Sequence, residues 1–146
     1  MQQLNVIGLD HHHAEQLGEK LNNLLANYQI FYMNVRGFHW NIKGDKFFEL
    51  HVKFEELYND LLIKVDEIAE RVLTLGGRPM HDYTSYITKA QIKEATNLTD
   101  GNACVESILD SLELLIKKQR VVFLFYIVVG ISPLYLANSD GIRLIK

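Results

Sequence analysis

The chain has 146 residues, of which 48% are hydrophobic and 23% are charged, and its formal net charge is −3 at pH 7. This length and composition predict one soluble globular domain with a sizeable core. The weakly acidic charge excludes a surface that attracts nucleic acid through its overall charge, because phosphate binding needs a cationic face. The single cysteine, Cys104, excludes an internal disulfide, and we expect it to be a small buried apolar residue.

The N-terminal residues and the apolar runs indicate whether the protein is secreted or crosses a membrane. Residues 1–10 lack the basic segment and apolar run of a signal peptide. The longest apolar run, residues 121–131, is too short for a membrane span, which needs about 20 residues. We therefore expect a cytoplasmic protein that does not cross a membrane.

Two long helices are predicted in the first half of the chain. Asp10 is a favourable N-cap, and apolar residues then recur at three- and four-residue steps as far as about Trp40. After a break at residues 41–44, Asp45 is expected to cap a second helix over residues 46–75. That helix has no Gly or Pro and carries one apolar stripe: Leu50, Phe54, Leu57, Leu61, Val65, Ile68, Val72 and Leu75.

The second half predicts less regular structure. Gly76 and Pro79 end the second helix. A polar connection over residues 80–102 is expected to hold one short helix near residues 86–90, and a third long helix begins near Ala103. No strand-like alternation of useful length occurs. The pattern therefore predicts an all-α single domain, an antiparallel helical bundle.

Five residues form a candidate metal-binding set: His39, His51, Glu55, Asp66 and Glu70. Histidine and carboxylate ligands together suit iron or zinc, and helical bundles often build such sites. Asp66 and Glu70 are four residues apart and share a helix face, as do His51 and Glu55. The alternative interpretation is that each pair belongs to a solvated face and that His39 is a core or capping histidine.

The spacing along the second helix constrains any such site. His51 and Asp66 are fifteen residues apart, about 22 Å along a helix, so they cannot bind one ion within one chain. Fifteen residues are close to four turns, so both side chains point in similar directions. A two-fold axis near the middle of the helix would bring His51 of one copy opposite Asp66 and Glu70 of another. The spacing permits a site shared between two copies.

Residues 27–44, 47–51 and 66–71 resemble the first two helices of the Dps family, the DNA-binding proteins from starved cells. The resemblance extends over residues 4–120, and residues 121–146 are atypical. It implies a ferritin-like four-helix bundle that assembles into hollow twelve-subunit shells. It also implies a ferroxidase that oxidises Fe(II), preferably with hydrogen peroxide, and stores the ferric product inside to limit oxidative damage.

The same resemblance implies roles for the candidate residues. His39 and His51 of one chain, with Asp66 and Glu70 of a two-fold mate, would hold the iron and form the catalytic site. Glu55 would supply a further acidic group near the second metal position. Zinc is an alternative metal, since related sites can prefer it in one position.

Two features depart from the family. DNA-binding members commonly use a lysine-rich tail, but residues 1–10 contain no Lys or Arg, which argues against direct DNA binding. The run His11–His13 is expected to be a solvated first turn. A DNA-compacting or structural shell protein remains the alternative function.

The second departure is the C-terminal segment. Residues 121–131 are apolar on every side of a helix, and Ser132 and Pro133 then break the pattern, so the fourth bundle helix is expected to be missing or altered. We hypothesise that residues 121–146 follow a shifted reading frame, in which case the chain could be an assembly-defective product. Resequencing the coding DNA through codon 121 tests this.

Overall fold

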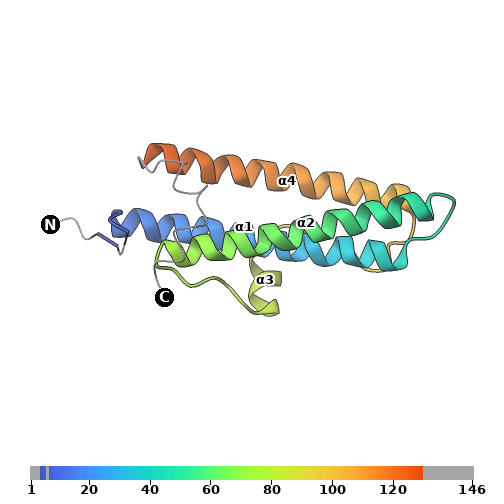
Figure 1. The fold of residues 1–146 in the computed structure, drawn as a ribbon, viewed down its shortest axis with the longest axis horizontal. Helices are drawn as coiled ribbons and strands as arrows, with labels where there is room; N and C mark the ends of the chain where they lie inside the picture. The colour runs from blue at the N-terminus through green and yellow to red at the C-terminus, as the bar shows by residue number, and fades with distance from the viewer. Residues whose placement is uncertain (1–3, 6, 130–146) are drawn as a thin grey trace.

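The computed structural model describes residues 4–5 and 7–129, which fold into three long helices and one short helix (Figure 1). These are α1 (His11–Asn41), α2 (Phe47–Thr74), α3 (Tyr83–Lys89) and α4 (Gly101–Val128). Helix α1 lies at the centre of the arrangement, since it packs against each of the other three. The predicted all-α bundle is confirmed.

The helix starts follow from capping side chains. The Asp10 carboxylate accepts a hydrogen bond from the His13 amide at 3.0 Å, so the predicted cap of α1 is confirmed. Helices α3 and α4 begin earlier than predicted because Asp82 and Asp100 cap them in the same way. A cap that stands several residues before the first periodic apolar residue is easily missed when only periodicity is followed.

The predicted cap of α2 by Asp45 is wrong. The N-cap residue is Lys46, and it makes no side-chain capping bond. Gly44 adopts a positive φ of 104°, and its carbonyl oxygen accepts a hydrogen bond from the Phe47 amide at 3.1 Å. A main-chain turn therefore satisfies the end of the helix in place of a carboxylate.

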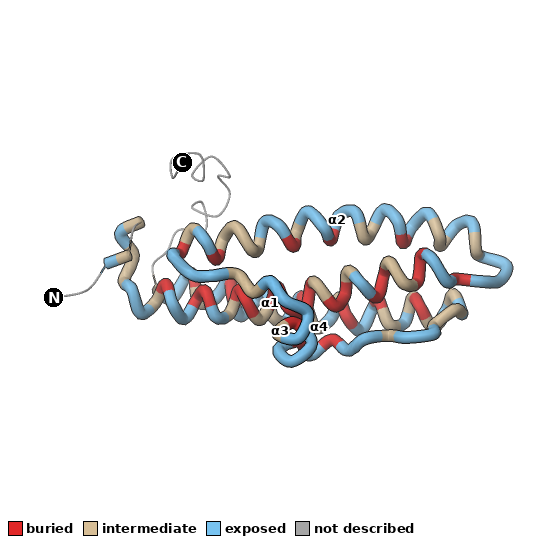
Figure 2. The backbone as a smooth tube through the Cα atoms, turned by 90° about the horizontal axis from the view of Figure 1, so that it is seen from below, coloured by how far each residue is buried: buried red, intermediate tan, exposed pale blue. Residues whose placement is uncertain are grey.

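Helix α2 buries one side and exposes the other. Its buried positions recur on the side that faces α1, whereas the opposite side is exposed (Figure 2). The predicted stripe accordingly supplies Phe54, Leu61, Val65, Val72 and Leu75 to the core. Burial of these apolar side chains against α1 is the main force that joins the two helices.

Three buried asparagines of α1 hold the long connection that follows α2. The side chains of Asn22, Asn27 and Asn34 each bond to main-chain groups of that connection. The Oδ1 atom of Asn27 accepts two hydrogen bonds, from the amides of Gln91 at 2.9 Å and Ile92 at 3.0 Å. Irregular backbone can therefore run against α1 without unpaired amides at these positions.

Helix α4 continues eight residues beyond Arg120, so the start of the atypical segment is helical. Val122 and Tyr126 are buried there and Phe125 is half-buried, whereas five large apolar side chains are exposed: Val121, Phe123, Leu124, Ile127 and Val128. The expectation about the fourth bundle helix falls on residues 130–146, which lie outside the described residues. Within residues 4–5 and 7–129, no helix is both long enough and apolar enough to cross a membrane.

Candidate metal centre

The structure brings together two of the predicted ligands, His39 and His51. His39 lies in the last turn of α1 and His51 lies near the start of α2, so the short loop between these helices places them side by side. Their rings stack with centroids 3.7 Å apart and an angle of 23° between the planes. The pair is formed within one chain.

Each of the two imidazoles is fixed by the other residue's main chain. The His39 Nδ1 atom donates to the carbonyl oxygen of His51, and the His51 Nδ1 atom donates to the carbonyl oxygen of His39, both at 2.8 Å. A carbonyl oxygen can only accept, so the proton of each neutral ring resides on Nδ1. Both Nε2 atoms therefore carry a free lone pair, the form in which histidine binds a metal ion.

Aromatic neighbours further restrict the two rings. The Phe47 ring stacks on His51 with centroids 5.0 Å apart, and the Tyr58 ring meets His39 edge-on at 5.3 Å. His39 is buried, with 8% of its surface exposed. The rings of the pair are thus held in position before any metal ion binds, which lowers the cost of ordering the site.

The predicted carboxylates do not join this pair within one chain. Glu55 and Asp66 are exposed and Glu70 is half-buried, and their carboxylates make no hydrogen bond or ion pair with the described residues. Across residues 4–5 and 7–129, no group of three or more His, Cys, Asp or Glu side chains could hold a metal ion. A single chain therefore presents two imidazoles and no complete site.

The exposed side of α2 is more apolar than a solvated helix face. At 3.6 residues per turn, Asp66 shares this side with several exposed large apolar side chains. These are Phe48, Val52, Leu62, Ile63 and Leu73, each at least 50% exposed. Exposed apolar side chains grouped around carboxylates are typical of an interface, which weakens the interpretation of Asp66 and Glu70 as part of a solvated face.

Arg36 is a residue near this pair that the sequence analysis did not single out. Its guanidinium carbon lies 4.7 Å from the ring centroid of Trp40, 5.4 Å from that of Tyr32 and 5.7 Å from that of Tyr58. The spacing of residues 32, 36 and 40 on one helix face was a usable signal. The contact with Tyr58 on α2 depends on the tertiary structure.

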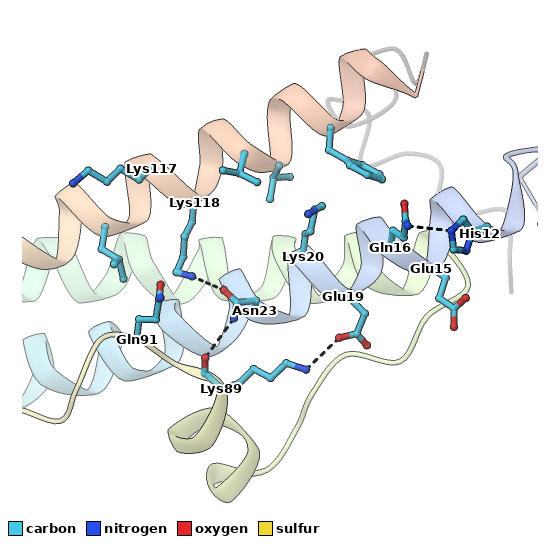
Figure 3. Close-up of a pocket in the computed structure, with 14 residues that line it drawn as sticks. His12, Glu15, Gln16, Glu19, Lys20, Asn23, Lys89, Gln91, Lys117 and Lys118 are labelled. Atoms are coloured by element: carbon cyan, nitrogen blue, oxygen red, sulfur yellow. Dashed lines mark hydrogen bonds and ion pairs between the residues drawn. The ribbon is translucent and has the colours of Figure 1, made fainter.

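A groove of about 920 Å³ lies away from the histidine pair, between α1 and α4 (Figure 3). Four lysines line it: Lys20, Lys89, Lys117 and Lys118. Two of their ammonium groups are engaged across the groove, Lys89 with Glu19 at 3.2 Å and Lys118 with Asn23 at 2.6 Å. With Glu15 and Glu19 as the carboxylates of the lining, the lysines outnumber them, which makes the groove a poor site for a metal ion. His12, at one end of the groove, is exposed, as expected for the first turn of α1.

Comparisons with known proteins agree with the fold and with the helices that carry the histidine pair. Residues 18–123 match the family profile of the ferritin-like domain. The DNA protection during starvation protein of Porphyromonas gingivalis is 40% identical over 119 residues, which cover 82% of this chain and 75% of that protein.

Solved structures give the same result. The Dps protein of Vibrio cholerae, described as a member of the ferritin-like diiron-carboxylate proteins, matches with a TM-score of 0.87 and 51% identity, over 89% of this chain and 81% of that one. The Dps protein of Bacillus brevis matches with a TM-score of 0.80 and 31% identity, over 92% and 87%. The chain belongs to the ferritin-like proteins. Within them it is a member of the Dps family, whose members store iron and protect against oxidative damage.

Proposed function

We propose that the protein is a ferroxidase that oxidises Fe(II) and stores the ferric product. The observation that carries this proposal is the reciprocal bonding of His39 and His51, which occupies both Nδ1 atoms and leaves the two Nε2 atoms to bind a metal ion. Imidazole and carboxylate ligands together suit iron. The Vibrio cholerae relative is described as a diiron-carboxylate protein, which supports iron as the substrate here.

The proposed site is shared between two copies of the chain. Asp66 and Glu70 of a second copy complete the ligand set of His39 and His51, and Glu55 contributes a further acidic group. Two observations support this arrangement: in the part of one chain that the structure describes, no carboxylate joins the two histidines, and the carboxylates lie on an exposed apolar side of α2. Two α2 helices that cross near Asn59, midway between His51 and Asp66, would form two equal sites.

The proposed oxidant is hydrogen peroxide. Two Fe(II) ions each lose one electron, the peroxide gains both, and its O–O bond breaks to give two hydroxide ions. Transfer of both electrons to one peroxide avoids release of a hydroxyl radical. Carboxylate oxygens from the second copy favour the Fe(III) product, because hard anionic ligands stabilise the more highly charged ion.

We propose a homo-oligomer in the cytoplasm, with the two-fold dimer as the unit that contains the iron sites and the family's twelve-subunit shell as the full assembly. Cys104 is buried and free, as suits a reducing compartment. The exposed apolar side of α2 supports self-association. Sedimentation of the purified chain measures the size of the assembly.

Mixing of two inactive variants tests the shared site. His51→Ala and Asp66→Asn each remove a ligand, and each protein alone should lose rapid Fe(II) oxidation. In a mixed dimer, one site carries both changes and the other is intact. If equal amounts are unfolded and refolded together, half of the dimers are mixed, so the rate should return to about one quarter of the wild-type value.

The control is a refolded mixture of His51→Ala and His39→Ala, which both alter the histidine half of the site. No dimer in that mixture contains an intact site, so oxidation should stay absent. If the first mixture also recovers nothing while wild-type protein treated in the same way oxidises iron, the shared site is wrong. If wild-type protein does not oxidise Fe(II) with peroxide, the ferroxidase proposal is wrong.

A further inference from the structure

Arg36 is held by three aromatic rings, those of Tyr32, Trp40 and Tyr58. One of its terminal nitrogens, Nη1, also donates a hydrogen bond to the Tyr32 hydroxyl at 3.0 Å. These contacts fix the plane of the guanidinium group and remove much of the flexibility of the side chain. An arginine ordered in this way loses little further entropy when it binds an anion.

The bonding of Arg36 is incomplete. The residue is half-buried, its Nε atom is buried without a hydrogen-bond partner, and it makes no ion pair with the residues that the structure describes. A buried donor without an acceptor is unfavourable, and a partly desolvated cation without an anion is more so. A carboxylate from outside the single chain that bonds to the terminal nitrogens would supply the missing anion, whereas the buried Nε is not open to it.

Arg36 adjoins the histidine pair. It lies three residues before His39 on α1, so the two side chains are neighbours on one helix face. The Tyr58 ring contacts both side chains. Its centroid lies 5.7 Å from the Arg36 guanidinium carbon and 5.3 Å from the centroid of the His39 ring. A group that approaches the Nε2 atoms of the pair therefore comes close to Arg36.

We propose that Arg36 is a positioning residue of the iron site, and that it bonds to the Asp66 and Glu70 carboxylates of a second copy. The inference rests on the proposed function, because those carboxylates reach the site only across the dimer. Charge complementarity supports it, since the cation and the two carboxylates all lack ion-pair partners among the described residues of the single chain. A guanidinium group can orient a carboxylate through two parallel hydrogen bonds. A residue that orients a metal ligand in this way affects the affinity of the site for the metal.

The test uses Co²⁺ as a redox-inert probe of the assembled protein, with binding measured by calorimetry and by its visible spectrum. Arg36→Met keeps most of the aliphatic contact with the rings and removes every donor. It should weaken Co²⁺ binding by about 10- to 100-fold. Arg36→Lys retains the charge without the fork, so it should recover part of that loss. Arg78→Met, at an exposed arginine, is the matched control and should bind Co²⁺ as the wild type does.

A combination of substitutions at Arg36 and at the two carboxylates distinguishes a positioning role of Arg36 from a packing role. In a protein that already carries Asp66→Asn and Glu70→Gln, Arg36→Met should cause no further loss of the weak residual Co²⁺ binding. An equal loss in both backgrounds would show that Arg36 only supports Tyr58, and would overturn the inference.

Failure of the inference and failure of the proposed function give different results. If Arg36→Met leaves Co²⁺ binding unchanged while Asp66→Asn strongly weakens it, the inference is wrong and the shared site stands. If the wild type neither binds Co²⁺ nor oxidises Fe(II), the proposed function is wrong, and the role of Arg36 falls with it.

Discussion

The imidazoles of His39 and His51 each donate from Nδ1 to the other residue's carbonyl oxygen at 2.8 Å. This reciprocal pair joins the last turn of α1 to the start of α2 and sets the tautomer of both rings in one arrangement. The same two bonds thus stabilise the turn between the helices and prepare the Nε2 atoms for a metal ion.

Removal of one imidazole should slow Fe(II) oxidation strongly and lower stability only modestly. We expect His51→Ala to lower the rate of Fe(II) oxidation at least about 10-fold, since a ligand is lost. The free energy of unfolding should fall by about 1–3 kcal/mol, because the ring's hydrogen bond to the His39 carbonyl oxygen and its stacking on His39 and Phe47 are removed. His81→Ala, at an exposed histidine, is the control. Stopped-flow oxidation and circular dichroism measure the two effects, and normal oxidation in His51→Ala would exclude it as a ligand.

Asn27 should contribute more to stability than its polar character indicates. In Asn27→Ala the part-buried bond from the Gln91 amide and the buried bond from the Ile92 amide both lose their acceptor, and an unpaired buried amide costs about 1–3 kcal/mol. We expect the free energy of unfolding to fall by about 2–4 kcal/mol. Urea titrations at one fixed protein concentration measure it, because self-association also affects apparent stability. Asn41→Ala, at an exposed asparagine, should change stability far less; an equal loss in both would argue against this role of Asn27.

Tyr126 should make the protein sensitive to alkali. Burial raises the pKa of its hydroxyl from 10.0 to about 12, and this hydroxyl has no hydrogen-bond partner among the described residues. The contribution of Tyr126 to the free energy of unfolding is complete below pH 10 and is lost as the pH rises towards 12. In that range the hydroxyl ionises in the unfolded chain but not yet in the folded one, which favours unfolding. The loss reaches about 2–3 kcal/mol.

Tyr126→Phe should remove that part of the pH dependence. Thermal unfolding of both proteins at several pH values between 9 and 12 measures the difference. Tyr83→Phe, at a tyrosine that is 75% exposed, should behave as the wild type does. Identical alkaline profiles for Tyr126→Phe and the wild type would contradict the assignment.

Cys104 should be unreactive in the folded protein. It is fully buried, and burial together with the nearby Asp100 raises the pKa of its thiol, so little thiolate forms at neutral pH. We expect one thiol per chain to react with a disulfide reagent only after unfolding. Rapid labelling of the native protein would show that α4 opens at this position.

Direct DNA binding should be absent at physiological salt. The net charge is −3, and residues 1–10 carry no Lys or Arg. A gel-shift assay over a range of salt concentrations should show no retarded complex. A complex that forms at low salt and dissociates as salt is added would instead favour the DNA-compacting alternative, since phosphate contacts are lost in that way.

Residues 121–129 show where local pattern was informative and where it was not. The apolar run indicated only a departure from the family pattern, whereas α4 extends through it to Val128 with Phe123, Leu124 and Ile127 exposed. The helix starts were less accurate. The predicted Asp45 cap of α2 was wrong because the Gly44 carbonyl oxygen accepts the hydrogen bond of the Phe47 amide at the start of that helix. Which group accepts this bond depends on main-chain geometry.

The sequence by itself determined the helices and the division of the candidate site. Apolar periodicity is a local property, so it predicted α1 and α2, and the helical rise alone separated His51 from Asp66 by too great a distance for one ion. Only the tertiary structure decided the stacking of His39 on His51, the bonds of Asn27 and the three rings around Arg36. Those contacts join side chains to backbone or rings on other elements, and their geometry is set by how the helices pack, which no local spacing encodes.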